Sequence, residues 1–160
     1  MSEKKADSDI KTVARNRKAR HLYHIEEVYE AGLVLKGTEV KSLRAGKASI
    51  VDAFGRIIKG EIWLMGSHID EYDHGNRWNH DPRRKRKLLL HSREIRKLTQ
   101  KINERGCTLV ALSLYFVRGL AKVELGLARG KKMFDRREDL KQRDNDRDMR
   151  RALRREHEDE

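Results

Sequence analysis

The stretch that decides the fold is residues 107–128, which read CTLVALSLYFVRGLAKVELGLA. Its first half, Cys107 to Val117, is a continuous apolar run, the pattern of a strand buried on both faces. Arg118-Gly119 then predicts a turn. Between residues 121 and 128 apolar side chains alternate with charged or small ones, which indicates a half-buried antiparallel strand. The stretch therefore predicts a hairpin inside a β-rich domain.

Two shorter elements precede this hairpin. The β-branched and aromatic residues between Leu22 and Glu30 predict a first strand, and Ala31-Gly32 predicts a bend after it. Residues 39–45 carry an apolar pair at helical spacing and are followed by Gly46, which predicts a short helix with a glycine cap.

The middle of the chain supplies the remaining elements. Apolar runs at residues 50–58 and 62–69 flank Lys59-Gly60-Glu61, the pattern of a second hairpin. Residues 70–86 are polar and contain the only proline, which predicts a long surface loop. Ser92 is predicted to cap a helix that runs to about Arg105, because one face is apolar and a glycine follows. About six strands and two or three helices without a βαβ rhythm predict a mainly β fold, an OB-like six-stranded antiparallel barrel.

The two ends of the chain lack the apolar pattern of a core. Residues 1–19 are polar and basic and are interpreted as a flexible N-terminal arm, which leaves 20–130 as the barrel domain. Residues 131–160 hold 11 basic and 10 acidic side chains, with no proline or glycine. Acid–base pairs at helical spacing are worth only about 0.2–0.5 kcal/mol each. We therefore expect this tail to be disordered when free and helical on a partner.

The charge of the chain indicates a polyanionic partner. The formal net charge is +12, and residues 1–130 carry 27 basic against 16 acidic side chains. A basic folded surface gains affinity by releasing counterions from nucleic acid. An anionic membrane is the weaker candidate, because the apolar stretches are too short to span one. The single cysteine fits a reducing compartment, so a cytoplasmic protein is expected.

Basic and aromatic residues supply the candidate RNA contacts. The run from Arg83 to Lys87, which includes Arg86, leads into an apolar segment, so that at most alternate side chains of a strand could follow a phosphate track. The alternative is a solvated basic edge that discourages strand pairing. Asn79, together with Asn76, Arg77, Trp78 and His80, suits stacking on unpaired bases and contacts to 2′-hydroxyls. The helix at 39–45 would expose Lys41 and Arg44.

No set of residues predicts a metal site or catalysis. The acids and histidines of the 70–86 loop match no zinc or calcium spacing. Cys107 sits where cysteine is usually a small buried hydrophobe. The segment from Gly126 to Lys132 has the wrong spacing for a phosphate loop. We therefore expect a protein that is not an enzyme and has no metal and no cofactor.

Six blocks of residues resemble those of one family in order along the chain. They are Asn16–His21, Glu26–Gly32, Gly37–Lys47, Asp81–His91, Ala111–Tyr115 and Gly130–Lys132. At these spacings the chain closely resembles the SmpB family of bacterial SsrA-binding proteins. The resemblance implies an OB-like barrel that binds the tRNA-like domain of transfer-messenger RNA and delivers it to stalled ribosomes for trans-translation. It also implies a monomer that makes no bond itself.

The resemblance further implies roles for individual residues. Asn16, Glu30 and Leu89 fall at positions associated with RNA engagement. The full predicted RNA-binding set is Asn16, Arg17, Arg20, His21, Tyr23, Glu30, Lys41, Arg44, Lys47, Asn79, Arg83, Arg86, Lys87 and Leu89. The tail would enter the 16S rRNA decoding centre and the empty mRNA channel, with contacts by Gly130, Lys131, Lys132, Phe134, Asp135, Arg136, Arg137, Arg143 and Arg147.

Two tail positions depart from the family pattern. Phe134 stands where many members have histidine, and Asn145 where some have an aromatic residue. Base stacking survives the first change, but a proton-dependent role does not. The main alternative function is a generic OB-fold RNA-binding or ribosome-assembly factor, and a more distant one is an enzyme that modifies or cleaves RNA.

Overall fold

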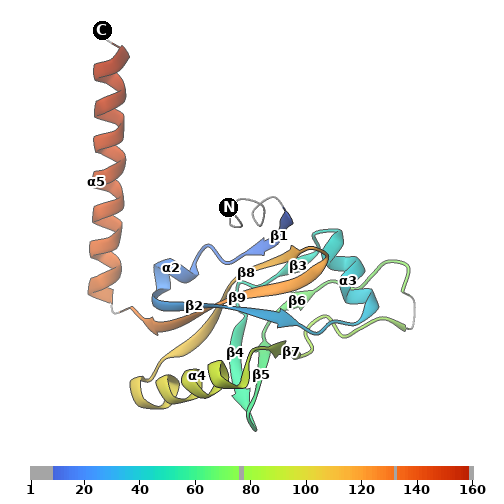
Figure 1. The fold of residues 1–160 in the computed structure, drawn as a ribbon. Helices are drawn as coiled ribbons and strands as arrows, with labels where there is room; N and C mark the ends of the chain where they lie inside the picture. The colour runs from blue at the N-terminus through green and yellow to red at the C-terminus, as the bar shows by residue number, and fades with distance from the viewer. Residues whose placement is uncertain (1–8, 76–77, 132, 159–160) are drawn as a thin grey trace.

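A closed ring of six antiparallel strands forms the body of the protein in the computed structural model (Figure 1). The structure describes residues 9–75, 78–131 and 133–158, without the side chains of 133–136 and 156–158. The strands follow the order β8-β4-β5-β7-β2-β9, and pairing of β8 with β9 closes the ring. Their bounds are β2 Tyr23–Leu33, β4 Phe54–Ile58, β5 Glu61–Met65, β7 Arg86–Leu89, β8 Thr108–Val117 and β9 Leu120–Gly130. The predicted OB-like barrel is confirmed.

Within the part of the chain that the structure describes, three more strands and four helices are added to the ring. The strands are β1 (Ile10–Arg15), β3 (Ala48–Ser49) and β6 (His68–Ile69). The helices are α2 (Ala19–Leu22), α3 (Gly37–Arg44), α4 (Ser92–Arg105) and α5 (Met133–Glu158). β1 pairs with the C-terminal half of β8. It lies along the same edge of β8 to which β4 pairs near the beginning of that strand. This pairing corrects the prediction of a flexible arm through residue 19, because residues 10–15 are an ordered strand.

Both predicted hairpins are present. The turns between β4 and β5 and between β8 and β9 each place two successive residues at positive φ, Lys59-Gly60 and Arg118-Gly119. Two left-handed residues in a two-residue loop match the twist of antiparallel strands, and glycine adopts this conformation without strain. These turns therefore fix the register of each hairpin.

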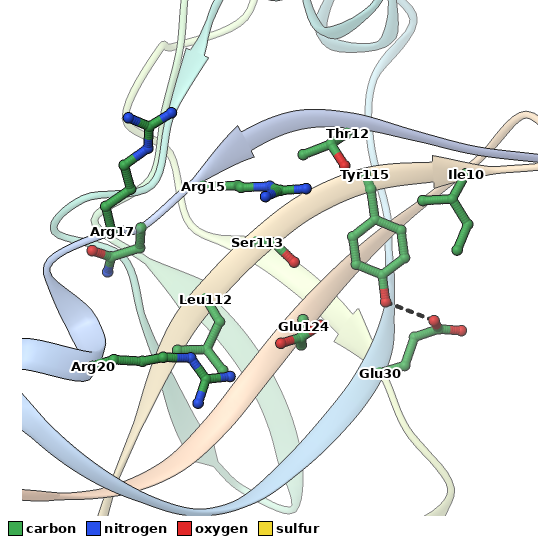
Figure 2. Close-up of a pocket in the computed structure, with 11 residues that line it drawn as sticks. Ile10, Thr12, Arg15, Arg17, Arg20, Glu30, Leu112, Ser113, Tyr115 and Glu124 are labelled. Carbon is green, nitrogen blue, oxygen red and sulfur yellow. Dashed lines mark hydrogen bonds between the residues drawn. The ribbon is translucent and has the colours of Figure 1, made fainter. Parts of the chain in front are cut away.

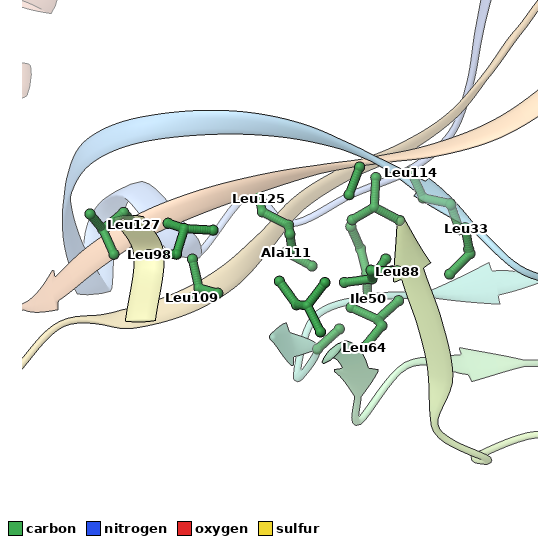
Figure 3. Packing of buried hydrophobic residues seen from close by; sticks show 14 of the residues in the cluster. Leu33, Ile50, Leu64, Leu88, Leu98, Leu109, Ala111, Leu114, Leu125 and Leu127 are labelled. Carbon is green, nitrogen blue, oxygen red and sulfur yellow. The ribbon is translucent and has the colours of Figure 1, made fainter. Parts of the chain in front are cut away.

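Inward-facing leucines fill the ring (Figure 3), and α4 lies at one end of it (Figure 1). Leu64 from β5, Leu109 from β8 and Leu125 from β9 are at most 1% exposed. Leu98 of α4 is fully buried against the same cluster. Burying one such side chain contributes about 1.5–3 kcal/mol. The packing thus decides which side of each strand faces the interior and which remains available for partners.

β2 runs straight through the predicted bend at Ala31-Gly32. Gly32 pairs with Leu89 of β7, and a Cβ atom on Gly32 would lie 3.3 Å from the Cβ atom of Leu89. The glycine therefore serves a close approach of two strands rather than a turn. The bend prediction was wrong for this reason.

The last helix, α5, extends away from the barrel (Figure 1). Its 26 residues correspond to about 39 Å at 1.5 Å per residue. Nearly all of the side chains from Arg137 to Arg155 are exposed. That this helix forms only on a partner stays a prediction. Within the described ranges, none of the helices combines the length and the apolar character needed to cross a bilayer.

Candidate nucleic-acid interface

A cavity of about 560 Å³ opens where β1 and the start of α2 meet β2, β8 and β9 (Figure 2). Three arginines stand around it, Arg15 from β1, Arg17 from the turn that follows and Arg20 from α2. The side chains of all three are exposed. The remaining lining residues are Ile10, Thr12, Asn16, Glu30, Leu112, Ser113, Tyr115 and Glu124. Guanidinium groups at the mouth of a cavity suit bidentate binding of phosphate.

Asn16 fixes the backbone that carries these arginines. Its main-chain N–H donates to the carbonyl of Leu112 at 2.8 Å. Its side-chain nitrogen donates to the carbonyl oxygens of Val51 at 3.2 Å and Ala111 at 3.1 Å. Both side-chain donor bonds therefore stay within the fold, while Oδ1 is buried without a hydrogen-bond partner among the described residues. Asn16 positions the neighbouring arginines, Arg15 and Arg17.

Two carboxylates form the opposite wall of the cavity. Glu30 of β2 and Glu124 of β9 are direct cross-strand partners, an arrangement that like charges disfavour. The hydroxyl of Tyr115 donates to Oε2 of Glu30 at 2.6 Å (Figure 2). Burial raises the pKa of Tyr115, and the bond to Glu30 and the charges of both glutamates raise it further. The hydroxyl therefore stays protonated and holds Glu30 in place beside its like-charged neighbour.

Replacing Tyr115 with phenylalanine tests this contact. We expect the free energy of unfolding at pH 7 to fall by about 0.5–1.5 kcal/mol, because one hydrogen bond is lost. The pKa of Tyr115 is raised in the folded protein, so its stabilisation is complete below the unfolded tyrosine pKa of about 10 and is lost at higher pH. Urea unfolding from pH 7 to 11.5 should show the gap between the two proteins narrowing above pH 10. A constant gap would contradict a role for the hydroxyl proton.

The same glutamate joins this cavity to a second one. A space of about 400 Å³ is lined by Glu30, Gly32, Leu89, Leu90, His91, Glu94 and Lys122. Leu89, at the end of β7, is 54% exposed. The structure thus brings Asn16, Glu30 and Leu89 onto one continuous surface.

Other predicted contacts lie away from these two cavities. Lys47 pairs with Asp73 at 3.1 Å, and the ammonium of Lys41 lies 5.2 Å from the ring centroid of Tyr72. Arg44 is exposed at the end of α3. Lys41 and Lys47 thereby contact the loop between β6 and β7, and Arg44 lies three residues after Lys41 on α3. They form a separate basic group that neither cavity includes.

Two aromatic predictions lie beside α2. Tyr23 is half-buried, packs against the small cluster around Ala19 and lines a third cavity of about 260 Å³ that also includes Asn16. His21 is half-buried within α2. Both are near the arginine cavity without lining it.

Arg86 was wrongly predicted as a surface contact. Its side chain is fully buried, because Arg86 and Leu88 of β7 face the interior of the barrel while Lys87 and Leu89 face outward. The guanidinium pairs with the buried carboxylate of Glu39 and donates to Ser67 Oγ at 2.9 Å and to the carbonyl of Pro82 at 3.0 Å. The buried guanidinium of Arg86 therefore holds the loop between β6 and β7 from its inner side. Arg83 is exposed, and Lys87 faces outward with Glu61 3.3 Å away.

Glu39 is the partner that sequence reasoning missed. Burial alone would raise its pKa, yet hydrogen bonds from Arg84, the main chain of Lys36 and Arg86 hold the pKa below its usual range. The carboxylate is therefore ionised inside the protein and joins α3 to the basic run. The sequence signal that could have indicated a structural role for Glu39 was an acidic side chain in the first turn of α3.

Asn79 forms hydrogen bonds within its own loop, and its contact with RNA stays a prediction. Its side-chain oxygen accepts from the main-chain N–H of Tyr72 at 3.0 Å, and its nitrogen donates to the carbonyl of the same residue at 2.6 Å. His80 is buried between the hydroxyl of Thr38 and the carbonyl of Ile69. Both residues therefore close the loop internally. Asn76 and Arg77 lie outside the described residues.

The start of the tail is joined to the barrel. Gly130 pairs with Tyr23 at the end of β9, and the main-chain N–H of Lys131 donates to the carbonyl of Leu22 at 2.9 Å. The ammonium of Lys131 bonds Asp139, and this hydrogen bond lowers the pKa of that carboxyl group. The remaining arginines, Arg137, Arg143 and Arg147, are exposed on α5. Lys132 lies outside the described residues, as do the side chains of Phe134, Asp135 and Arg136.

Comparisons with known proteins agree on one family. A family model described as SmpB protein matches residues 13–155. The SsrA-binding protein of Thermobifida fusca is 63% identical over 145 residues, which covers 91% of each chain. That of Geobacter metallireducens is 60% identical over 144 residues, covering 90% of this chain and 94% of the relative. A solved structure described as "tmRNA-SmpB: a journey to the center of the bacterial ribosome" matches with a TM-score of 0.62 and 57% identity, covering 74% of this chain and 84% of the other.

Proposed function

Since this chain belongs to the SmpB family, we propose that it binds the transfer-messenger RNA SsrA and carries it to the bacterial ribosome for trans-translation. One observation supports this proposal most directly. The arginine cavity gathers Asn16, Arg17, Arg20 and Glu30, which the sequence predicts to contact RNA, into one site on the barrel. Because both partners work in the cytoplasm, the protein acts there too.

The geometry suits recognition by shape more than by base sequence. Arg15, Arg17 and Arg20 can bind successive phosphates at the mouth of the cavity. The carboxylates of Glu30 and Glu124 can accept hydrogen bonds from 2′-hydroxyls or from exocyclic amines of unpaired bases. The barrel thereby holds the tRNA-like domain. The protein contributes binding and orientation to the reaction, and no bond is made by its own residues.

The tail acts at a different place in this proposal. The exposed arginines of α5 pair with ribosomal RNA phosphates in the decoding centre and the empty mRNA channel, and these contacts stabilise the helix. An intact message competes for the same channel. Selection of stalled ribosomes then follows from exclusion by the message rather than from base reading.

Removing two cavity arginines tests the RNA assignment. For Arg17→Ala combined with Arg20→Ala, we expect the slope of log affinity against log salt to become shallower by about 1.4–1.8, since each phosphate contact contributes about 0.7–0.9. Between 50 and 200 mM salt the wild-type protein should lose roughly tenfold more affinity than the variant. Fluorescence anisotropy with the isolated tRNA-like domain measures both slopes.

The matched control removes the same charge from the exposed face of α4, with Arg93→Ala combined with Lys97→Ala. This protein should keep the wild-type slope. Equal slopes for the cavity variant and the wild type would contradict phosphate binding at the cavity. Equal affinity for an unrelated RNA hairpin of the same length would favour the generic RNA-binding alternative.

A further inference from the structure

The outer face of β4, β5 and β7 carries a patch that the proposed function leaves unused. Alternation places Gly55, Ile62, Leu64, Arg86 and Leu88 inside the barrel, all of them buried. The side chains between them therefore face outward. We call the outward group of Phe54, Arg56, Trp63, Lys85 and Lys87 the tryptophan patch.

Strand register places a cation on either side of the tryptophan. Arg56 of β4 pairs directly with Trp63 of β5, and Trp63 pairs directly with Lys87 of β7. Directly opposed side chains are about 4.5–5.5 Å apart at their Cβ atoms. Phe54, 41% exposed, lies two residues along β4 on the same side of the sheet. The patch thus combines two aromatic rings with a row of positive charge.

A third cation lies over the ring itself. The ammonium of Lys85 is 4.7 Å from the ring centroid of Trp63. Such a contact at an exposed site is worth only about 0.5–1 kcal/mol, so a stacked base can displace it. The displaced ammonium then remains near enough to pair with the phosphate of that nucleotide.

The charge of the face favours a polyanion. Glu61 is the sole acid within the three strands, whose residues are all described, and it lies 3.3 Å from Lys87. Aromatic rings beside cations on the outside of a barrel are the surface that single-stranded nucleic acids use. A folded duplex cannot use it, because stacking requires unpaired bases.

The patch lies on a different part of the barrel from the arginine cavity. That cavity is lined from β1, α2, β2, β8 and β9, whereas the patch uses β4, β5 and β7 on the other half of the ring. Phe54 alone lies near that side, because it lines the third cavity together with Asn16. We infer that the tryptophan patch binds a second, unpaired RNA strand while the cavity holds the tRNA-like domain. This inference rests on the proposed function only for what occupies the cavity.

A fluorescein-labelled ten-nucleotide oligouridine is the probe. We expect binding to the full-length protein already saturated with the tRNA-like domain. Trp63→Leu should weaken it at least about fivefold, the low end of what loss of one stacked base costs. Trp63→Phe, which keeps an aromatic ring, should stay within about threefold of wild type. Both variants should bind the tRNA-like domain normally.

Tryptophan fluorescence measures binding at Trp63 directly, and this measurement does not require the leucine variant to fold. In Trp78→Phe protein, Trp63 is the only tryptophan, and oligouridine should quench its fluorescence. Absence of quenching, or equal affinities for wild type and Trp63→Leu, would overturn the inference. Displacement of oligouridine by the tRNA-like domain would also overturn it, while leaving the proposed function intact. Equal binding of a polyglutamate peptide would assign the patch to an acidic protein instead.

Discussion

Replacing Arg86 with methionine is expected to lower the free energy of unfolding by about 3–5 kcal/mol. The substitution leaves the carboxylate of Glu39 buried with one charged partner fewer. It also removes hydrogen bonds to Ser67, Arg84 and Pro82, so several buried carbonyl and hydroxyl groups lose a partner. Urea unfolding monitored by circular dichroism measures the loss.

Two further proteins identify the buried pair as the cause. Arg83→Met removes a neighbouring exposed cation from the same basic run and should change stability by at most about 0.5 kcal/mol. Replacing Arg86 and Glu39 together by methionine should cost less than Arg86→Met alone, because no uncompensated charge remains inside. A loss below 1 kcal/mol for Arg86→Met would show that the ion pair does not hold the loop.

Deleting residues 131–160 is expected to abolish tagging of stalled ribosomes while leaving affinity for the tRNA-like domain within a few-fold. The reason is the spatial separation of the two parts. Cavity residues come from β1, α2 and the ring, whereas α5 extends away from the barrel (Figure 1). Anisotropy with the tRNA-like domain and a reconstituted tagging assay measure the two effects.

A helix-breaking variant separates the need for a helix from the need for charge. Asn145 lies in the middle of α5 and is exposed. Proline there costs about 3 kcal/mol or more, whereas alanine favours the helix. Asn145→Pro should therefore lose tagging and Asn145→Ala should keep it. A large loss of RNA affinity in the deletion protein would instead assign the tail to primary RNA binding.

Local signals sufficed where they agreed with tertiary packing. The helix predicted to run to about Arg105 is present, because an apolar face and a glycine in the left-handed conformation mark its course and its end. Its start was wrong by one position, since Ser92 is the first helical residue and His91 is the N-cap. The two hairpins followed from their turn residues. β1 was missed because it has few apolar side chains and forms by pairing with β8, about 100 residues later in the sequence.

The candidate site was less accessible to sequence reasoning. Asn16 and Glu30 came from the family resemblance, and the structure adds Tyr115 and Glu124 by bringing distant strands together. For the basic run from Arg83 to Lys87, the sequence indicated that at most every second side chain could point to the same face of a strand. It could not show that Arg86 faces inward, because the buried carboxylate that permits this, Glu39, lies 47 residues away in the sequence.

The closed ring also constrains how the protein reaches its native state. β2 and β9 are neighbours, yet Tyr23 and its partner Gly130 are separated by roughly 100 residues. A nascent chain therefore cannot complete the barrel until nearly all of it has been synthesised. High contact order of this kind predicts folding in milliseconds to seconds. During that interval the apolar strand β8 has no finished partner and depends on solubility conferred by the charged segments around it.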